Sequence, residues 1–305
     1  MTSPKPCPKC GFCPQQATAE CSRCGIVFAK YRPRSARTAA PVTPTRQPFF
    51  EADHWEIPEP EALKALAIGA ALAAIILLFS PLHFAMGYLV TLVHEMGHAA
   101  AWWLMGSPAI PSFDFTYGGG VTHQYGRNLL LLMALYAAGS YPFFVRRHHR
   151  GLLACWLCLL ALHLLVTFSS LSEPVALMMG HGTELLFAAL CFYRTLSNRG
   201  IIIAAERPLY AAIGFFIVIE DLIFATRLMA DQGFISAYEG AKGGGHWMDF
   251  SRIADTWFDG DLSWMAGLFF MSCLATPVIG YLAFHFRVPA ITGILRFLEL
   301  KNEKS

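Results

Sequence analysis

Hydrophobic residues dominate the chain from Ala62 onward, where long apolar runs follow one another with short polar interruptions. The length of each run is close to that of a membrane-spanning α-helix, which needs about 20 residues. The pattern predicts seven hydrophobic helices, at about 62–80, 82–105, 128–145, 151–171, 174–193, 208–229 and 263–286. We therefore expect a polytopic α-helical membrane protein with six or seven transmembrane helices.

The composition agrees with this fold class and divides the chain into parts. Of the 305 residues, 14% are charged, against roughly 25% in soluble domains, and 55% are hydrophobic. Residues 1–46 carry eight Lys or Arg and one acid, whereas residues 47–61 carry five acids and no base. We expect a small N-terminal domain at 1–30, a proline-rich linker at 31–60, a membrane domain at 61–290 and a cytoplasmic tail at 291–305.

The basic residues between the helices bear on orientation, because Lys and Arg are enriched on the cytoplasmic side of a membrane. Three basic segments, at 146–150, 194–207 and 287–304, are separated by two predicted helices each and therefore fall on one side. The basic N-terminus favours the same side, yet three helices separate it from 146–150. We expect one of the first three helices not to cross the membrane fully.

The second predicted helix contains His94-Glu95-Met96-Gly97-His98, an H-E-x-x-H motif. Residues four apart share one face of a helix, so His94 and His98 can bind one zinc ion. Glu95 lies beside them as a general base for a water whose pKa zinc lowers to about 7. Five residues alone are a weak signal, since the motif also arises by chance on helix surfaces.

The surroundings of the motif strengthen this interpretation. The segment 81–106 is apolar apart from His83 and the three ionisable motif residues. Ionisable groups at membrane depth cost roughly 2.5–3.5 kcal/mol each and usually mark function. The alternative is a histidine pair that is satisfied by hydrogen bonds to neighbouring helices.

The N-terminal domain carries a second metal signal. Cys7, Cys10, Cys21 and Cys24 form two C-x-x-C pairs, each followed by glycine, and four thiolates can hold a structural zinc ion. We expect a small zinc ribbon, with disulfides as the alternative. No apolar leader is found before it, so we expect a cytoplasmic N-terminus, in a bacterial inner membrane. The ribbon is expected to bind a protein partner and no nucleic acid.

A short β-hairpin is predicted between the second and third helices. Phe113, Phe115 and Tyr117 alternate with polar residues, and three glycines then precede Val121. A strand edge beside an active site can bind an extended peptide through its backbone. We expect Gly119, Gly120 and Val121 to contact substrate, the alternative being an inert loop at the membrane surface.

With the motif in an early membrane helix and a glycine-bearing hairpin after it, residues 82–145 resemble the site-2 protease family of intramembrane zinc metallopeptidases. The resemblance implies that His94 and His98 bind zinc, that Glu95 is the general base, and that the substrate is a membrane-anchored protein. The family takes its third ligand from an Asp-Gly pair in a later helix. This chain departs from that pattern, because Asp259-Gly260 lies in a polar segment.

Other residues are candidates for the third ligand. His181 and Glu184 share a face of an apolar helix, and we expect His181 to bind the metal, with Glu184 either a ligand or the acceptor that orients a histidine. The alternative is a polar pair that packs helices together. His246 and Asp249 lie in a glycine-bearing connection that can fold back to the metal, although a plain loop is the simpler interpretation.

Three classes of function follow from these patterns. The first is a zinc endopeptidase with one catalytic and one structural zinc ion, acting on proteins anchored in the lipid bilayer. The second is a catalytically silent membrane scaffold with structural zinc, against which the intact Glu95 argues. The third is a histidine-rich di-iron oxidoreductase, a class that needs about eight clustered histidines, whereas only one proper pair is present.

Overall fold

The computed structural model describes residues 7, 9–10, 19–30, 59–113, 119–145, 150–197, 201–240 and 248–287. The chain forms two compact units, Met1–Glu51 and Ala52–Ser305. The predicted tail at 291–305 lies outside the described residues, as does the predicted linker up to residue 58. Its last two residues, Glu59 and Pro60, belong to the first helix of the second unit.

In the first unit, the described residues form a tight turn around the cysteines. Gly25 has a φ of 70°, in the left-handed region, and its amide donates to the carbonyl of Cys21 at 2.8 Å. The Cys21 amide donates in turn to the carbonyl of Ile26 at 3.0 Å. Glycine adopts this conformation without steric cost, which explains its place after the second cysteine pair. A short 3-10 helix, η1 (Phe28–Lys30), follows.

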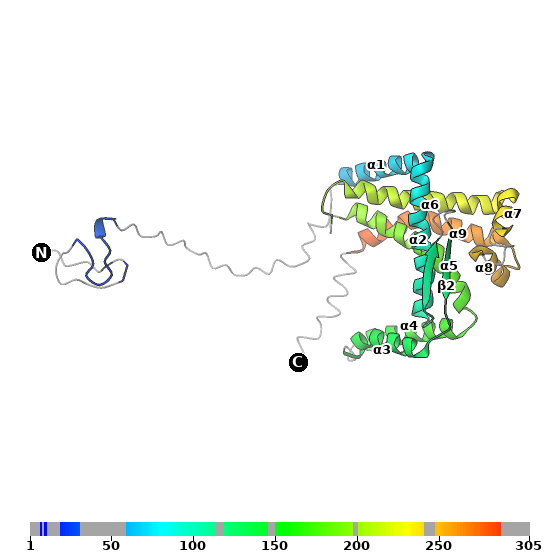
Figure 1. Ribbon diagram of the computed structural model, residues 1–305, viewed down its shortest axis with the longest axis horizontal. Coiled ribbons are helices and arrows are strands. Elements are labelled where there is room, and N and C mark those ends of the chain that lie inside the picture. The colour runs from blue at the N-terminus through cyan, green and yellow to red at the C-terminus, as the bar shows by residue number, and fades with distance from the viewer. Residues whose placement is uncertain are drawn as a thin grey trace. The chain divides into compact units, whose positions relative to one another are not determined.

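The second unit is mostly helical, with one pair of strands (Figure 1). All seven predicted hydrophobic helices are present, with ends within three residues of the expected positions. In chain order the elements are α1 (Glu59–Leu78), α2 (Ser80–Leu104), β1 (Ala109–Phe113), β2 (Gly120–Gln124), α3 (Leu129–Val145), α4 (Arg150–Phe168), α5 (Ser172–Leu196), α6 (Glu206–Ala230), α7 (Gln232–Gly240), α8 (Asp249–Trp257) and α9 (Leu262–His285).

Five of the described helices are long and apolar enough to cross a membrane: α1, α4, α5, α6 and α9. The apolar helix α3 has 17 residues, one short of that length class. The motif helix α2 has 25 residues but is not among the five. Five such helices support the prediction of a membrane protein.

Helices α7 and α8 were not predicted, because we expected an irregular polar connection between Ala230 and Leu262. The sequence of α8 nevertheless has a helical pattern, since Phe250, Ile253 and Ala254 recur at a spacing of three and four and are fully buried. Their burial fastens α8 to the helices around it. His246, a candidate from the same connection, lies outside the described residues.

The core of the second unit lies among α5, α6, α8 and α9, where Phe216, Phe250 and Phe269 are buried together. Helix α1 packs along α6, and α2 packs against α5. Figure 1 shows that α2 runs across the direction of α6, with the strand pair lying along α2. The motif helix is therefore transverse to one of the candidate membrane spans.

A hairpin is present as predicted, in the form of an antiparallel pair of strands in which Ala109 is opposite Gln124 and Phe113 is opposite Gly120. Its first strand, Ala109–Phe113, begins earlier than the predicted strand at Phe113, Phe115 and Tyr117. Its first strand follows the end of α2, where Gly106 adopts a φ of 78° and closes the helix. The indole of Trp103 donates to the carbonyl of Ala109 at 2.8 Å and ties β1 to α2. Phe115, Tyr117 and Gly118 lie outside the described residues.

Candidate metal centre

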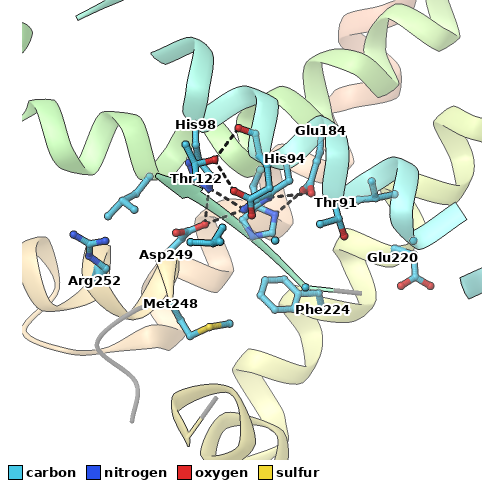
Figure 2. Close-up of a pocket in the computed structure, with 18 of the residues that line it drawn as sticks. Thr91, His94, His98, Thr122, Glu184, Glu220, Phe224, Met248, Asp249 and Arg252 are labelled. Carbon is cyan, nitrogen blue, oxygen red and sulfur yellow. Dashed lines mark hydrogen bonds and ion pairs between the residues drawn. The ribbon is translucent and has the colours of Figure 1, made fainter. Parts of the chain in front are cut away.

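Three side-chain atoms from two distant segments meet at the middle of α2. The Nε2 atoms of His94 and His98 are 2.9 Å apart, and each lies 3.0 Å from Oδ2 of Asp249 on α8 (Figure 2). In a tetrahedral zinc site, ligand atoms about 2.0 Å from the ion are separated by about 3.3 Å. The spacing of the three atoms is close to this value, so they can hold one metal ion.

The hydrogen bonds on the far sides of the two imidazoles support a metal more strongly than the distances do. His98 Nδ1 donates to the carbonyl of Ala176 at 2.8 Å, and His94 Nδ1 donates to Oε1 of Glu184 at 3.0 Å. A neutral imidazole with its proton on Nδ1 has a lone pair on Nε2. Both lone pairs then face each other and a carboxylate oxygen, an arrangement that a cation at their centre stabilises.

The position of Asp249 is fixed by the helix that it begins. The amide of Phe250 donates to the hydroxyl of Tyr238 at 3.3 Å, and Arg252 forms an ion pair with Glu173 at the start of α5. These contacts hold the Asp249 carboxylate beside the two imidazoles, where it can serve as a ligand.

The structure places the expected third ligand, His181, behind the site. Its Nδ1 lies 2.6 Å from Oε2 of Glu184, while Oε1 of the same carboxylate accepts from His94. His94, His181 and Glu184 are also close enough together to form a metal group. An imidazole that offers Nε2 to the group with His98 and Asp249 carries its proton on Nδ1 and donates it to Glu184, so His94 cannot serve as a ligand in both groups. The geometry favours Asp249 as the third ligand and Glu184 as the acceptor that orients His94.

Glu184 and His181 are buried in the helix pair that carries the site. Glu184 is 3% exposed, and the ring of His181 lies against the rings of Phe224, Phe250 and Phe269. Both oxygens of Glu184 are held by imidazoles, and the buried carboxyl of Asp221 lies 4.0 Å from His181 Nδ1. Such a carboxylate–histidine pair fixes the orientation of the metal-binding imidazole and raises its basicity. His181 thus acts on the site through Glu184.

The general-base candidate Glu95 is held by the strand pair. Its Oε2 accepts a hydrogen bond of 2.6 Å from the hydroxyl of Thr122 on β2. A Cβ atom added at Gly120 would lie 2.5 Å from Cγ of Glu95 and closer still to Oε1, so only glycine leaves room for this side chain. Thr122 and Gly120 place the carboxylate, which is 5% exposed, against the wall of the site.

The three candidate ligand residues line a cavity of about 980 Å³. The predicted substrate-binding residues Gly119, Gly120 and Val121 line this cavity together with Thr122, Glu95 and the two motif histidines. Figure 2 shows Asp249 and the histidines at the middle of the cavity, with Arg252 on one side and Glu220 on the other. A cavity of this size, with convergent polar groups on one wall, suits a peptide or small-molecule ligand.

The four cysteines of the first unit also converge. Cys7 Sγ lies 3.6 Å from Cys24 Sγ, Cys10 Sγ lies 3.7 Å from Cys21 Sγ, and none of the four is in a disulfide. These distances are typical of thiolates around one tetrahedral ion, where sulfurs about 2.3 Å from zinc are about 3.8 Å apart. The four residues can therefore hold a metal ion.

The pKa values of two of these thiols shift in opposite directions. Burial raises the pKa of Cys7, but hydrogen bonds from the amides of Cys10 and Lys9 lower it to about 6. For Cys24, the hydrogen bond from the Ile26 amide is outweighed by burial and by the neighbouring sulfurs, which raise the pKa to about 12. The four sulfurs repel one another as thiolates, and a bound cation removes this repulsion.

Sequence reasoning missed two residues that shape the site at α2. Thr122 follows the predicted substrate-binding residues, and nothing in a single strand indicates that its hydroxyl reaches Glu95. Gly180 comes directly before His181, and a Cβ atom there would lie 2.5 Å from Nε2 of His98. A glycine beside a buried polar pair was the available signal, since such a glycine often marks a close approach.

The chain matches no protein-family model, and comparison with curated proteins and with solved structures also found no match.

We expect Asp249→Ala to remove the metal ion of the membrane unit, because this change deletes one of three ligands. Elemental analysis of the purified full-length chain should then show about one metal ion per chain, held by the ribbon, in place of about two. Asp255→Ala on the exposed face of the same helix is the matched control and should keep both ions. Full metal content in Asp249→Ala would contradict the assignment of this ligand.

We expect Gly180→Ala to weaken metal binding although it alters none of the ligand residues. The added Cβ would press on Nε2 of His98 and on the ring of His94. A Cβ at Gly182 would meet its nearest neighbour, Met179 Sδ, at an ordinary distance of 3.8 Å. Gly182→Ala is therefore the matched control. Competition with a fluorescent chelator should show at least about tenfold weaker binding for Gly180→Ala only. Equal affinities would show that the close approach is unimportant.

Proposed function

We propose that the protein is an intramembrane zinc-dependent endopeptidase that cleaves membrane-anchored proteins. The observation that carries this proposal is the convergence of His94, His98 and Asp249 beside the Glu95 carboxylate in one cavity. Three protein ligands and an open position facing a cavity are the arrangement of catalytic zinc sites, whereas structural sites are closed by four ligands.

The choice of zinc over iron rests on Glu95, which is adjacent in sequence to the candidate ligand His94. Two histidines and one carboxylate also bind iron in oxygenases, so the donor set alone fits two chemistries. Glu95 favours hydrolysis, because hydrolysis needs a base beside the metal to take a proton from water. Its placement by Thr122 and Gly120 supports that role. The four cysteines of the first unit suit a structural zinc ion by the same reasoning from ligand type.

Bound zinc would supply a Lewis acid that polarises the peptide carbonyl and acidifies the attacking water. The residues of this chain perform the proton transfers. The hydroxyl of Thr122 occupies Oε2 of Glu95, which leaves Oε1 to accept the proton of the attacking water. Glu95 then returns that proton to the amine nitrogen as the peptide C–N bond breaks. The amide bond is replaced by a carboxylate and an amine, so the hydrolysis is balanced.

The strand β2 is the proposed holder of the substrate. Gly119, Gly120 and Val121 line the cavity next to Glu95, where an extended peptide can add to the backbone of the strand. An extended conformation exposes the scissile carbonyl, which a helix would keep in its own hydrogen bonds. Because Gly120 has no Cβ, the Glu95 carboxylate can lie directly against β2, beside the position proposed for the peptide.

The transverse course of α2 suggests how the chain is oriented. With α2 lying within the membrane, the crossing helices would be α1, α3, α4, α5, α6 and α9. The basic segments at 1–46, 146–150, 194–207 and 287–304 then all face one side, the cytoplasm, and the acidic connection that contains α8 faces the other. This arrangement resolves the conflict among the basic segments.

We expect Glu95→Gln to reduce cleavage by about 10²- to 10⁴-fold, the usual contribution of a general base, while metal content stays unchanged. The assay is cleavage of single-span model substrates by the purified full-length chain in lipid vesicles, read by mass spectrometry. Glu239→Gln, an exposed carboxylate on α7 away from the cavity, should cleave like the unaltered chain. Cleavage that survives Glu95→Gln would contradict the peptidase proposal.

The orientation is tested by cysteines introduced at residues 148 and 240 and labelled in intact cells with a maleimide that does not cross membranes. Residue 240 should be labelled from outside, whereas residue 148 should be labelled only after the membrane is permeabilised. Peptide mass spectrometry assigns each label, so the native cysteines can stay in place. Labelling of both positions from the same side would show that α2 crosses the membrane or that another helix fails to.

A further inference from the structure

The cavity extends along α2 on both sides of the metal-binding atoms. Its lining includes Gly87 near the start of the helix and Trp102 near its end, with His94 and His98 between them. At 1.5 Å per residue, the distance from Gly87 to Trp102 is about 22 Å. An extended peptide of about six or seven residues has this length, so residues on both sides of a cleaved bond can contact the walls.

The two ends of the cavity differ in charge. Arg252 lines the end near His98, since its partner Glu173 lies one turn before Ala176, which accepts from His98. Glu220 on α6 lines the other end, where it contacts His83 near the start of α2 at 2.9 Å. Figure 2 shows the two residues on opposite sides of Asp249 and His94. The walls between them carry the candidate metal ligands and also apolar side chains, among them Val90, Leu177 and Phe224.

Arg252 remains able to bind a ligand although it is paired. A guanidinium carries five N–H donors, of which a carboxylate engages two at most. The side chain of Arg252 is 34% exposed and that of Glu173 is 50% exposed, so neither is closed off by the pair. Arg252 also follows Asp249 by three residues on α8, which places it on the same face of the helix as the metal ligand.

We propose that Arg252 selects substrates with a carboxylate side chain within about three residues of the cleaved bond, on the side of that bond that lies toward Trp102. The substrate class is an extended, mainly apolar segment with an acidic residue at the Arg252 end, and Glu220 disfavours a second acid at the opposite end. This inference rests on the proposed peptidase function and adds the polarity of its substrate.

The experiment uses the full-length chain in vesicles and a set of single-span substrates that differ only by Glu, Gln or Lys at each of three positions on either side of the bond. We expect Glu to be cleaved about tenfold faster than Lys at one or more positions on one side only. Mass spectrometry identifies the bond and gives the direction in which the substrate lies.

Variants separate the charge of Arg252 from its contact with Glu173. Glu173→Gln removes the ion pair but keeps the cation, so the preference for Glu should remain. The exchange Arg252→Glu with Glu173→Arg keeps an ion pair and places an acid on α8, so the preference should turn toward Lys. The exchange Arg227→Glu with Asp231→Arg reverses a surface pair outside the cavity and should change nothing.

Three results would overturn the inference, and they differ in what else they affect. Cleavage that depends on Glu95 but is equal for Glu, Gln and Lys in the unaltered chain removes the role of Arg252 and leaves the peptidase function standing. A preference that survives the charge exchange does the same. If no substrate in the set is cleaved in a Glu95-dependent manner, the proposed function and the inference fail together. Metal analysis of each variant identifies any that have lost Asp249 from the site.

Discussion

The close approach of α2 and α5 is the constraint on which the site depends. Gly97 on α2 and Gly180 on α5 allow this approach, because a Cβ at either position would overlap atoms of the partner helix. The approach brings the carbonyl of Ala176 within 2.8 Å of His98 and the carboxylate of Glu184 within 3.0 Å of His94. Both imidazoles are thereby oriented with Nε2 toward the cavity.

Helix α8 completes the site from a different part of the chain, and this has consequences for stability. Two of the three candidate ligands, His94 and His98, lie on α2. The third, Asp249, begins α8, a helix of nine residues that is not among the candidate membrane spans. Its buried residues pack against α5 and α9, and the hydrogen bond from the Phe250 amide to Tyr238 ties it to α7. A metal ion would add a further link between α8 and α2, so metal loading and the position of α8 are coupled.

The sequence predicted the helices well because each is an apolar run near the length of a membrane span, a pattern that survives any tertiary arrangement. It also predicted His94, Glu95 and His98 as a group, because helical spacing alone brings the two histidines together. The third ligand is a different problem. His181 lies within the apolar helix α5, and Asp249 lies at the start of α8. Only the packing of α8 decides which of the two reaches Nε2 of His94.

The same reasoning explains why α8 itself was missed. A polar connection that contains glycines is typical of a loop. The helical spacing of Phe250, Ile253 and Ala254 covers too few residues to predict a helix against that composition. Burial of those three residues stabilises the helix, which shows that tertiary contacts rather than local preference determine this segment. The contact of Thr122 with Glu95 could not be predicted for the same reason, because it depends on the packing of β2 against α2.

The transverse course of α2 connects the site with the membrane. A helix that crossed the bilayer fully would carry Glu95, His94 and His98 to its centre, where ionisable groups are most costly and water is scarce. A helix that lies across α6 keeps these residues at one depth, near the polar connection that holds Asp249 and Arg252 (Figure 1). The proposed hydrolysis would need water at the site as well as an apolar surface for a membrane segment. Val90 and Leu177 give the cavity such a surface, and Arg252, with 34% of its side chain exposed, lies at one end of the cavity.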